Sequence, residues 1–236
     1  MFGFSLDKGV VSPEIITTIE DVKNLEGDNI GYRQIRLINV DNPEQIKLEI
    51  EKAAANFDNQ GFIYLLNNNN SILTGTFISN IQILKSKKNN LNLRGYVWHQ
   101  PKGYYKAWKM KMANQINDKK IWKSFEKDEL QGWLVFALSN MDSGISKENL
   151  KIEINGNDFH NLDEFFCVLG EEINGVAGYF GRNIPAIYDC LRGGFGVHSI
   201  KELTWKNHAR SKKLFKTKFI EIMTIFQEFN IIINLE

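Results

Sequence analysis

Side chains able to do acid–base or metal chemistry are few in this chain and follow no known spacing. The four histidines are His99, His160, His198 and His208. None of them forms an HxxxH or HExxH pair, the spacing that places two ligands on one face of a helix. The two cysteines, Cys167 and Cys190, form no CxxC pair and are expected to be small buried hydrophobes. GxSxG and Walker sequences are also missing. The sequence therefore predicts no enzyme, no metal site and no cofactor.

A glycine-rich segment, GGFG at 193–196, invites comparison with a phosphate-binding loop. Such loops precede a helix, because the unpaired N–H groups of the first helical turn face the phosphate. Here the glycines follow a predicted helix, which favours an ordinary flexible loop.

A run of cations follows Trp205: Lys206, Arg210, Lys212, Lys213, Lys216 and Lys218. Cations interleaved with Trp205 and Phe215 could bind RNA by combining phosphate contacts with base stacking. The alternative is that these cations are solvated side chains at the start of a helix, with Phe215 directed towards the core. An RNA-binding module that uses Lys206–Lys218 is therefore the second functional hypothesis for this sequence.

The charges nearly cancel, with 29 Lys and Arg against 28 Asp and Glu in 236 residues. Residues 1–150 carry 19 basic and 17 acidic side chains, and residues 151–236 carry 10 and 11. Neither part has the positive excess of a dedicated nucleic-acid binder, so we do not expect nucleic acid as the main partner. The chain has no apolar run of about 18 residues and no basic, then apolar, leader at its start. We expect a cytoplasmic protein without a membrane span.

One carboxylate has a position that suggests a binding surface. The predicted helix over 183–192 has apolar residues at i, i+3, i+4 and i+7: Ile184, Ile187, Tyr188 and Leu191. At 100° per residue, Asp189 lies about 140° around the helix from Ile184 and therefore faces outward. Tyr188 belongs to the apolar stripe, which favours a core position for it.

From about residue 150 onward, the sequence resembles the barstar family, the intracellular inhibitors of barnase-type ribonucleases. Four segments carry this resemblance in the order of the family: KIEINGN at 151–157, YFGRNIPAIYDCL at 179–191, Trp205 followed by SKKL at 211–214, and FQE at 226–228. The first is an opening strand with an Asn-Gly turn. The second has the aromatic pair, glycine, asparagine and short helix that are the hallmark of the family.

The resemblance implies a domain that plugs the active site of a toxic ribonuclease, with carboxylates in place of RNA phosphates. Carboxylates suit this role because they form charge-assisted hydrogen bonds with the cations of a nuclease. The implied partner-binding residues are Tyr179 as an aromatic wedge, Asn183 as a turn-fixing amide, Tyr188 as a packing contact, Asp189 as the central carboxylate, Gly193 in the following loop, and Glu228 as a peripheral acid. From the residues alone, Asp189 and Glu228 could also be ordinary surface acids, and Tyr179 could pack on the sheet.

Departures from the family pattern point to a partner other than barnase. Pro185 stands where the family has a second acid, and Gly194 stands where an aromatic is expected, although Phe195 follows at once. Arg182 and Arg192 flank Asp189 and dilute the negative charge of this surface.

Two domains are expected to position these residues: an α+β domain at 1–145 with an unknown role, and an α/β barstar-like domain at 150–236 with a short parallel sheet packed by helices. The polar segment SNMDSGISKEN at 139–149 is the predicted boundary. The first domain is predicted to have helices at 14–25, from 43 and at 104–125, and strands at 32–40, 61–66, 75–84, 91–99 and 132–138. The helix from 43 is expected to have Ile46, Ile50, Ala53 and Phe57 on one face.

The second domain is predicted to have strands at 150–154 and 199–205, a buried strand at 230–235, and helices after Asn161, at 183–192 and at 214–229. Four acids of the helix after Asn161 are expected off its apolar stripe: Asp163, Glu164, Glu171 and Glu172. Strands separated by helices favour a parallel sheet, since each parallel connection must cross back over the sheet.

Overall fold

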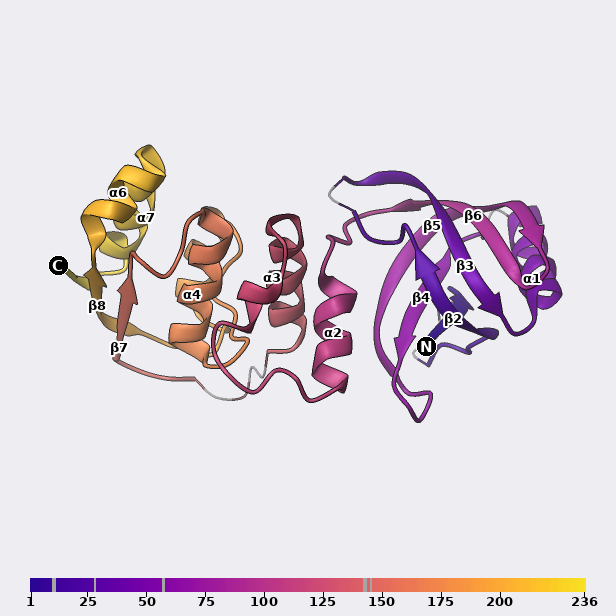
Figure 1. Cartoon of the computed structure of the whole chain (residues 1–236), viewed down its shortest axis with the longest axis horizontal. Coiled ribbons are helices and arrows are strands. Elements are labelled where there is room, and N and C mark those ends of the chain that lie inside the picture. Colours follow the sequence, from indigo (N-terminus) through magenta and orange to yellow (C-terminus); the bar gives the residue numbers. More distant parts are fainter. Residues whose placement is uncertain (10–11, 28, 57, 142–143, 145) are drawn as a thin grey trace. The chain divides into compact units, whose positions relative to one another are not determined.

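The computed structural model describes residues 1–9, 12–27, 29–56, 58–141, 144 and 146–236 (Figure 1). Phe57 and residues 142–143 and 145 of the polar segment lie outside the described residues. The chain forms two compact units, Met1–Lys102 and Gly103–Glu236. Residues 103–139 thus belong to the same compact unit as the C-terminal segment. The division of the chain into domains at 1–145 and 150–236 stays a prediction.

The first unit is a closed antiparallel barrel with the strand order β1-β2-β3-β6-β5-β4. Its elements are β1 (Phe2–Leu6), β2 (Thr17–Lys23), β3 (Gly31–Val40), α1 (Pro43–Ala55), β4 (Gly61–Leu66), β5 (Ile72–Lys87) and β6 (Asn90–Val97). Closure comes from the pairing of β1 with both β2 and β4. The barrel interior is apolar, and Phe4, Leu37 and Ile63 are fully buried.

Local signals explain most of the barrel elements. Asn42 caps α1 by accepting a hydrogen bond from the Gln45 N–H at 3.2 Å, and Pro43 begins the helix. The helix buries Ile46 and Ile50, as its apolar periodicity predicts. Strands β3 to β6 overlap the four strands expected over 32–99.

The helix predicted over 14–25 is wrong, because this segment contains strand β2. Thr17 and Ile19 are buried while Glu20 is exposed, which is the two-residue period of a strand. The β-branched residues of this segment favour a strand, and β1 and β3 supply partners on both sides. All five residues of β1 are buried, and this strand was not expected.

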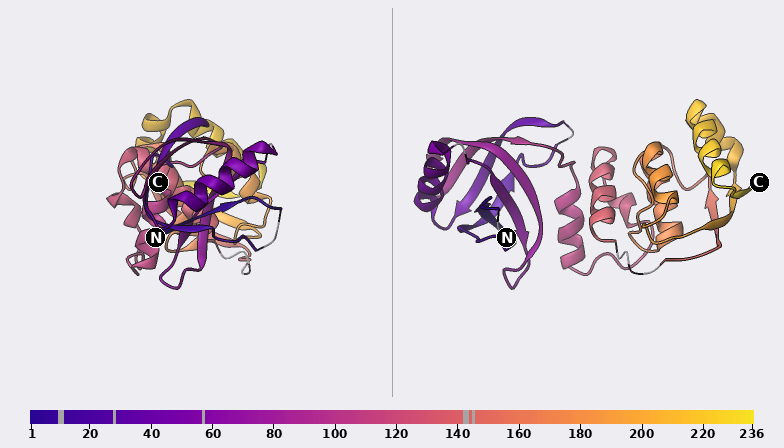
Figure 2. Two further views of the ribbon diagram at one scale, coloured as in Figure 1. Left: turned by 90° about the vertical axis from the view of Figure 1, so that its right-hand side faces the viewer. Right: turned by 180° about the vertical axis from the view of Figure 1, so that it is seen from behind.

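The second unit contains a parallel sheet in the order β7-β8-β9. Its elements are α2 (Tyr104–Met112), two short 3-10 turns (Ile121–Ser124 and Lys127–Glu129), α3 (Leu130–Ser139), β7 (Leu150–Asn155), α4 (Leu162–Asn174), α5 (Ile184–Leu191), β8 (Ile200–Lys206), α6 (His208–Phe215), α7 (Thr217–Glu228) and β9 (Ile232–Leu235). In Figures 1 and 2, α4 lies beside β7, while α6 and α7 (yellow) lie near the C-terminal strand.

Trp205 of β8 is the centre of the core in this unit. Its ring is fully buried, stacks on Phe165 of α4 with the centroids 5.5 Å apart, and contacts Phe219 of α7 at 5.0 Å. Both helices therefore cover the same face of the sheet. Side chains of the opposite face form the ion pairs Lys151–Glu202 and Lys206–Glu153, so that face is solvated.

Residues 103–139 attach to α4 through polar contacts around a buried carboxylate. Glu171 of α4 is only 2% exposed and accepts hydrogen bonds from the Lys120 N–H at 2.8 Å and the Trp122 indole N–H at 3.1 Å. Glu171 lies off the apolar stripe of α4, and it is buried because Lys120 and Trp122 cover it there. Burial raises the pKa of Glu171, while the N–H donors oppose the shift. Gln131 of α3 also donates to the Asp163 carboxylate at 2.7 Å.

Four further expectations for this unit are corrected. The apolar run predicted as a strand over 132–138 is helix α3, and the helix predicted over 104–125 ends at Met112. The helix predicted over 214–229 is two helices, separated at Lys216, whose φ is +54°. Strand β9 was expected to be buried, but it is a sheet edge in which Ile232 is 54% exposed and Leu235 44%.

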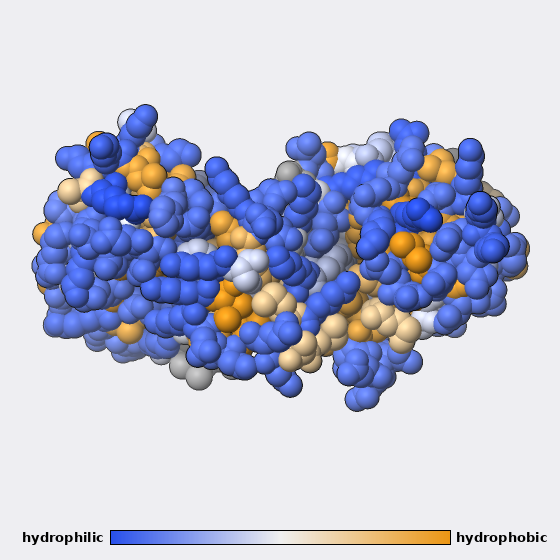
Figure 3. Space-filling model, in the orientation of Figure 1, coloured by the Kyte–Doolittle hydropathy of each residue, from blue (hydrophilic) through white to orange (hydrophobic). Residues whose placement is uncertain are grey.

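Among the described residues, no helix has the length and apolarity needed to cross a membrane. The same residues contain no group of three or more His, Cys, Asp or Glu side chains that could hold a metal ion. The surface drawn in Figure 3 is mainly hydrophilic, with its hydrophobic residues in separate small patches.

Candidate functional site

Helix α5 is the element that presents the predicted site, and its start is defined by two residues. The Asn183 side chain accepts a hydrogen bond from the Ala186 N–H at 2.8 Å, which is a helix N-cap. Gly181 has φ +96°, and a Cβ there would lie 2.9 Å from the backbone nitrogen of Ile187. The loop before α5 is therefore packed tightly against the first turn of the helix. Asn183 therefore fixes the start of α5, and its role in binding a partner stays a prediction.

The two faces of α5 differ as the helical periodicity predicts, except at Tyr188, for which the expected core position is wrong. Ile187, Cys190 and Leu191 are buried. Asp189 is exposed, and Tyr188, which the apolar stripe placed towards the core, is 40% exposed. A carboxylate and a phenol ring therefore stand next to each other on the outer face of a short, capped helix.

The end of α7 continues this outer face. The Tyr188 ring contacts Phe229 in an edge-to-face arrangement, with the centroids 5.2 Å apart and the planes at 72°. Phe229 is the residue after Glu228, which ends α7 and is exposed. The contact places Tyr188 beside the end of α7, where Glu228 is the adjacent residue. We use the name α5 surface for the exposed side chains of Tyr188, Asp189 and Glu228, whose joint role in binding stays a prediction.

Tyr179 lies beneath the α5 surface and is only 4% exposed. Its ring centroid is 6.1 Å from that of Phe195, which belongs to the loop after α5. Burial, together with Cys190 and Asp189, raises the pKa of Tyr179 to about 12, and Arg182 opposes the shift. The ring therefore packs inside the unit, and a contact between Tyr179 and a partner stays a prediction.

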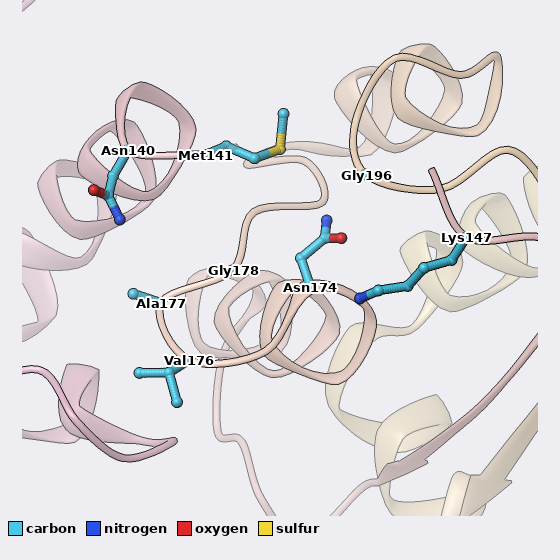
Figure 4. A pocket seen from close by; sticks show the side chains of 8 residues that line it. All are labelled: Asn140, Met141, Lys147, Asn174, Val176, Ala177, Gly178 and Gly196. Carbon is cyan, nitrogen blue, oxygen red and sulfur yellow. The ribbon is translucent and has the colours of Figure 1, made fainter. Parts of the chain in front are cut away.

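Asn174, which the sequence analysis did not single out, connects the two loops around α5. Its side-chain amide donates to the Tyr179 carbonyl at 2.7 Å and to the Phe195 carbonyl at 3.0 Å. Figure 4 shows Asn174 extending from the end of α4 into a cavity of about 200 Å³, towards the loop that contains Gly196. The only sequence signal here was an Asn-Gly pair at a helix end, which does not predict such a long reach.

Glycines make the loop after α5 compatible with this arrangement. Gly196 has φ +77°, and a Cβ there would lie 2.3 Å from the Asn174 side-chain oxygen. Gly193 has φ +106° and directly follows the C-cap of α5. Positive φ values favour glycine, so these residues set the path of the loop. The loop at 193–196 positions the Phe195 carbonyl to accept a hydrogen bond from Asn174. A phosphate-binding loop, in contrast, would direct its N–H groups at an anion.

The flanking arginines have different surroundings. Arg182 donates to the Gln131 side-chain oxygen at 3.3 Å, and its carbonyl accepts from the Gln131 amide at 3.2 Å. Arg182 is thereby held towards α3, whereas Arg192 is exposed at the end of α5. Of these two arginines, Arg192 is exposed and Arg182 is half-buried.

The cysteine next to Asp189 is not prepared for nucleophilic chemistry. Cys190 is 1% exposed, and burial together with the charge of Asp189 raises its pKa to about 12. A thiol with such a pKa stays protonated near neutral pH and is a poor nucleophile. Cys190 is therefore a small buried residue of the α5 core side, as the sequence predicts.

The cationic run at 206–218 lacks the exposed rings that RNA binding would need. Trp205 is fully buried, its indole N–H donates to the Ser211 hydroxyl at 3.0 Å, and Phe215 is 6% exposed. Lys206 is paired with Glu153, and Arg210 donates to the Phe159 carbonyl at 2.7 Å. Lys206 thus forms a surface ion pair, Arg210 is bonded to the backbone, and the two rings face the core.

Comparison with known proteins identifies a family for the C-terminal part of the chain. Residues 149–234 match the family model described as Barstar (barnase inhibitor). The match begins just before β7, ends in β9 and includes the whole α5 surface, so the resemblance seen in the sequence is confirmed for these residues. No curated protein matches the chain.

Proposed function

We propose that the barstar-family domain of this chain, residues 149–234, is an immunity protein that binds a toxic ribonuclease and occludes its active site with the α5 surface. The family match makes a ribonuclease inhibitor the expected class of protein. The observation that carries the proposal is Asp189, an exposed carboxylate on a helix that is capped by Asn183 and anchored by buried residues.

Asp189 has the chemistry of a phosphate substitute. Ribonucleases hold the RNA phosphates with cations, and a carboxylate offers those cations charge-assisted hydrogen bonds. Asp189 forms no ion pair with any described residue, so its charge is available to a partner. Glu228 adds a second carboxylate and Tyr188 an aromatic contact on the same surface.

The other predicted site residues have positioning roles in this proposal. Asn183 fixes the start of α5, and Gly193 allows the chain to turn at its end. Tyr179 supports the helix from below. The rigidity of these parts matters, because a preorganised surface loses less conformational entropy on binding. Binding without turnover in the cytoplasm, with a protein partner and no cofactor, is part of the proposal.

The test is a titration of ribonuclease activity with the full chain. The enzyme of first choice is the nuclease encoded nearest to the gene of this chain, with barnase-type ribonucleases as a second set. We expect RNA cleavage to stop at about one inhibitor per nuclease, because a plugged active site requires one domain per enzyme. Inhibition at strongly substoichiometric amounts would indicate an enzyme instead. Failure to form a complex with any of these nucleases would exclude the proposal.

A further inference from the structure

The barrel of the first unit has an outer face whose chemistry differs from that of the α5 surface. Pairing of β3 with β6 places Tyr32 opposite Tyr96, and Arg36 opposite Asn92. Pairing of β6 with β5 adds Lys85 opposite Asn92. Trp98 follows β6, two residues beyond Tyr96. Six residues define what we call the barrel face: Tyr32, Tyr96, Trp98, Arg36, Arg94 and Lys85.

The three aromatic residues form one exposed group. Trp98 is 59% exposed and Tyr32 is 49% exposed, values that are high for such large rings. Tyr96 lies between them, with its centroid 5.4 Å from Tyr32 and 5.7 Å from Trp98, in edge-to-face geometry with both. Tyr96 thus packs against both neighbours. The Trp98 ring remains largely exposed, while Arg94 lies over one face of the Tyr32 ring and leaves the residue 49% exposed.

Cations continue the same face. The Arg94 guanidinium lies 5.0 Å from the centroid of the Tyr32 ring, a cation–π contact that holds it beside the aromatic group. Arg36 and Lys85 are exposed. None of these three cations forms an ion pair with a carboxylate in the part of the chain that the structure describes.

The charge of the first unit is segregated along the chain. Residues 1–102 carry eleven basic and eleven acidic side chains, so the unit as a whole is neutral. The segment 59–102, which contains β4, β5 and β6, has five basic residues and no Asp or Glu. Although the net charge of the unit is zero, β5 and β6, two of the three strands of the barrel face, therefore have a local excess of positive charge.

We propose that the barrel face binds single-stranded nucleic acid. Bases can stack on Trp98 and Tyr32, because every base has a π-face, and the phosphates can bind Arg36, Arg94 and Lys85. The amides of Gln34 and Gln82, in register with Arg94, can donate and accept at base edges. A duplex cannot use the rings in this way, since its bases are stacked inside. The face extends roughly 20 Å along β6, at about 3.4 Å per residue, which suits a short single strand.

The cationic run at 206–218 provides an internal contrast. There the aromatic residues are buried, whereas on the barrel face they are exposed beside unpaired cations. A protein partner with an acidic surface would also be attracted by the cations, but it would not need the exposed π-faces or the amides between them. A single-stranded nucleic acid can use the cations, the exposed rings and the amides together, and this favours it as the ligand.

The test uses the full chain and a fluorescein-labelled oligouridylate of about ten nucleotides, a length within the range that a small barrel covers. Fluorescence anisotropy should show binding that weakens with salt. Three phosphate contacts predict a slope of log affinity against log salt near −2, at about −0.7 per contact. Trp98→Ala should weaken binding on the order of tenfold, and Trp98→Phe should retain most of it. A DNA oligonucleotide of the same length shows whether the ribose hydroxyls contribute.

The matched control is the double variant Lys212→Ala and Lys213→Ala, which removes two exposed cations from α6. It should bind the oligonucleotide as the unmodified chain does. Thermal unfolding of each variant shows that the fold is retained, which is expected since Trp98 is largely exposed. Three results would overturn the proposal: no binding of RNA or DNA by the unmodified chain, equal binding of a duplex, or a greater loss in the α6 variant than in Trp98→Ala. A dimer that Trp98→Ala dissociates would assign the face to a second copy instead.

Discussion

Asn174→Ala should loosen the loops that hold α5, because one side chain bonds to both of them. The amide of Asn174 donates to the carbonyls of Tyr179 and Phe195, at 2.7 and 3.0 Å. A hydrogen bond of this kind contributes about 0.5–1.5 kcal/mol to stability, so losing two should lower the free energy of unfolding by about 1–3 kcal/mol. The methyl group of alanine cannot replace either bond, and both carbonyls lose a donor.

Urea denaturation of the full chain, followed by circular dichroism, measures this change. Asn157→Ala is the matched control, since Asn157 is exposed and its side chain has no hydrogen bond among the described contacts. Amide hydrogen exchange should also accelerate at 175–182 and 193–196 in Asn174→Ala, before global unfolding. The reasoning is refuted if the two variants have equal stability and the loops keep their exchange protection.

Three further outcomes are expected. Burial raises the pKa of Glu171, so the native state binds the proton of this carboxyl more tightly than the unfolded state does. The resulting stability is present at low pH and is lost as the pH rises from about 4.5 through the raised pKa. Urea titrations should therefore show the unmodified chain losing stability relative to Glu171→Gln towards neutral pH, and a constant difference between the two would contradict this. The fragment 103–236 should unfold at higher urea than 150–236, because the latter lacks the helices and N–H donors that cover α4. Alanine at both Lys212 and Lys213 should leave ribonuclease binding nearly unchanged, as surface plasmon resonance can show, since both side chains are solvated.

The sequence predicted those elements whose start signals and periodicity agree with their surroundings. Asn42-Pro43 and Asn183 both cap helices, and the outward position of Asp189 follows from a 100° step alone. The prediction of a helix over 14–25 failed because two signals in the sequence conflict. Ser12-Pro13 is a helix start signal, whereas the β-branched residues that follow favour a strand, and the pairing of β2 with β1 and β3 stabilises the strand.

Other features could not be predicted because they depend on distant residues. The run at 132–138 is apolar on all sides, and periodicity cannot distinguish a buried helix from a buried strand in such a segment. The closing pair of the barrel joins β1 to β4, more than fifty residues later. The reach of Asn174 to two loops and the burial of Glu171 beneath Trp122 likewise depend on tertiary packing.

The most direct test of the α5 surface compares the dissociation of a ribonuclease complex for Asp189→Ala and Glu172→Ala. Glu172 is a suitable control because it lies on α4 and is already paired with Lys119 at 3.0 Å. Breaking a buried interfacial charge pair costs about 2–5 kcal/mol, a range that derives in part from barnase and barstar themselves. We therefore expect Asp189→Ala to accelerate dissociation at least about 30-fold, at 1.4 kcal/mol per factor of ten. Glu172→Ala should change it little. Equal and small effects of both substitutions would show that the ribonuclease is held by another surface.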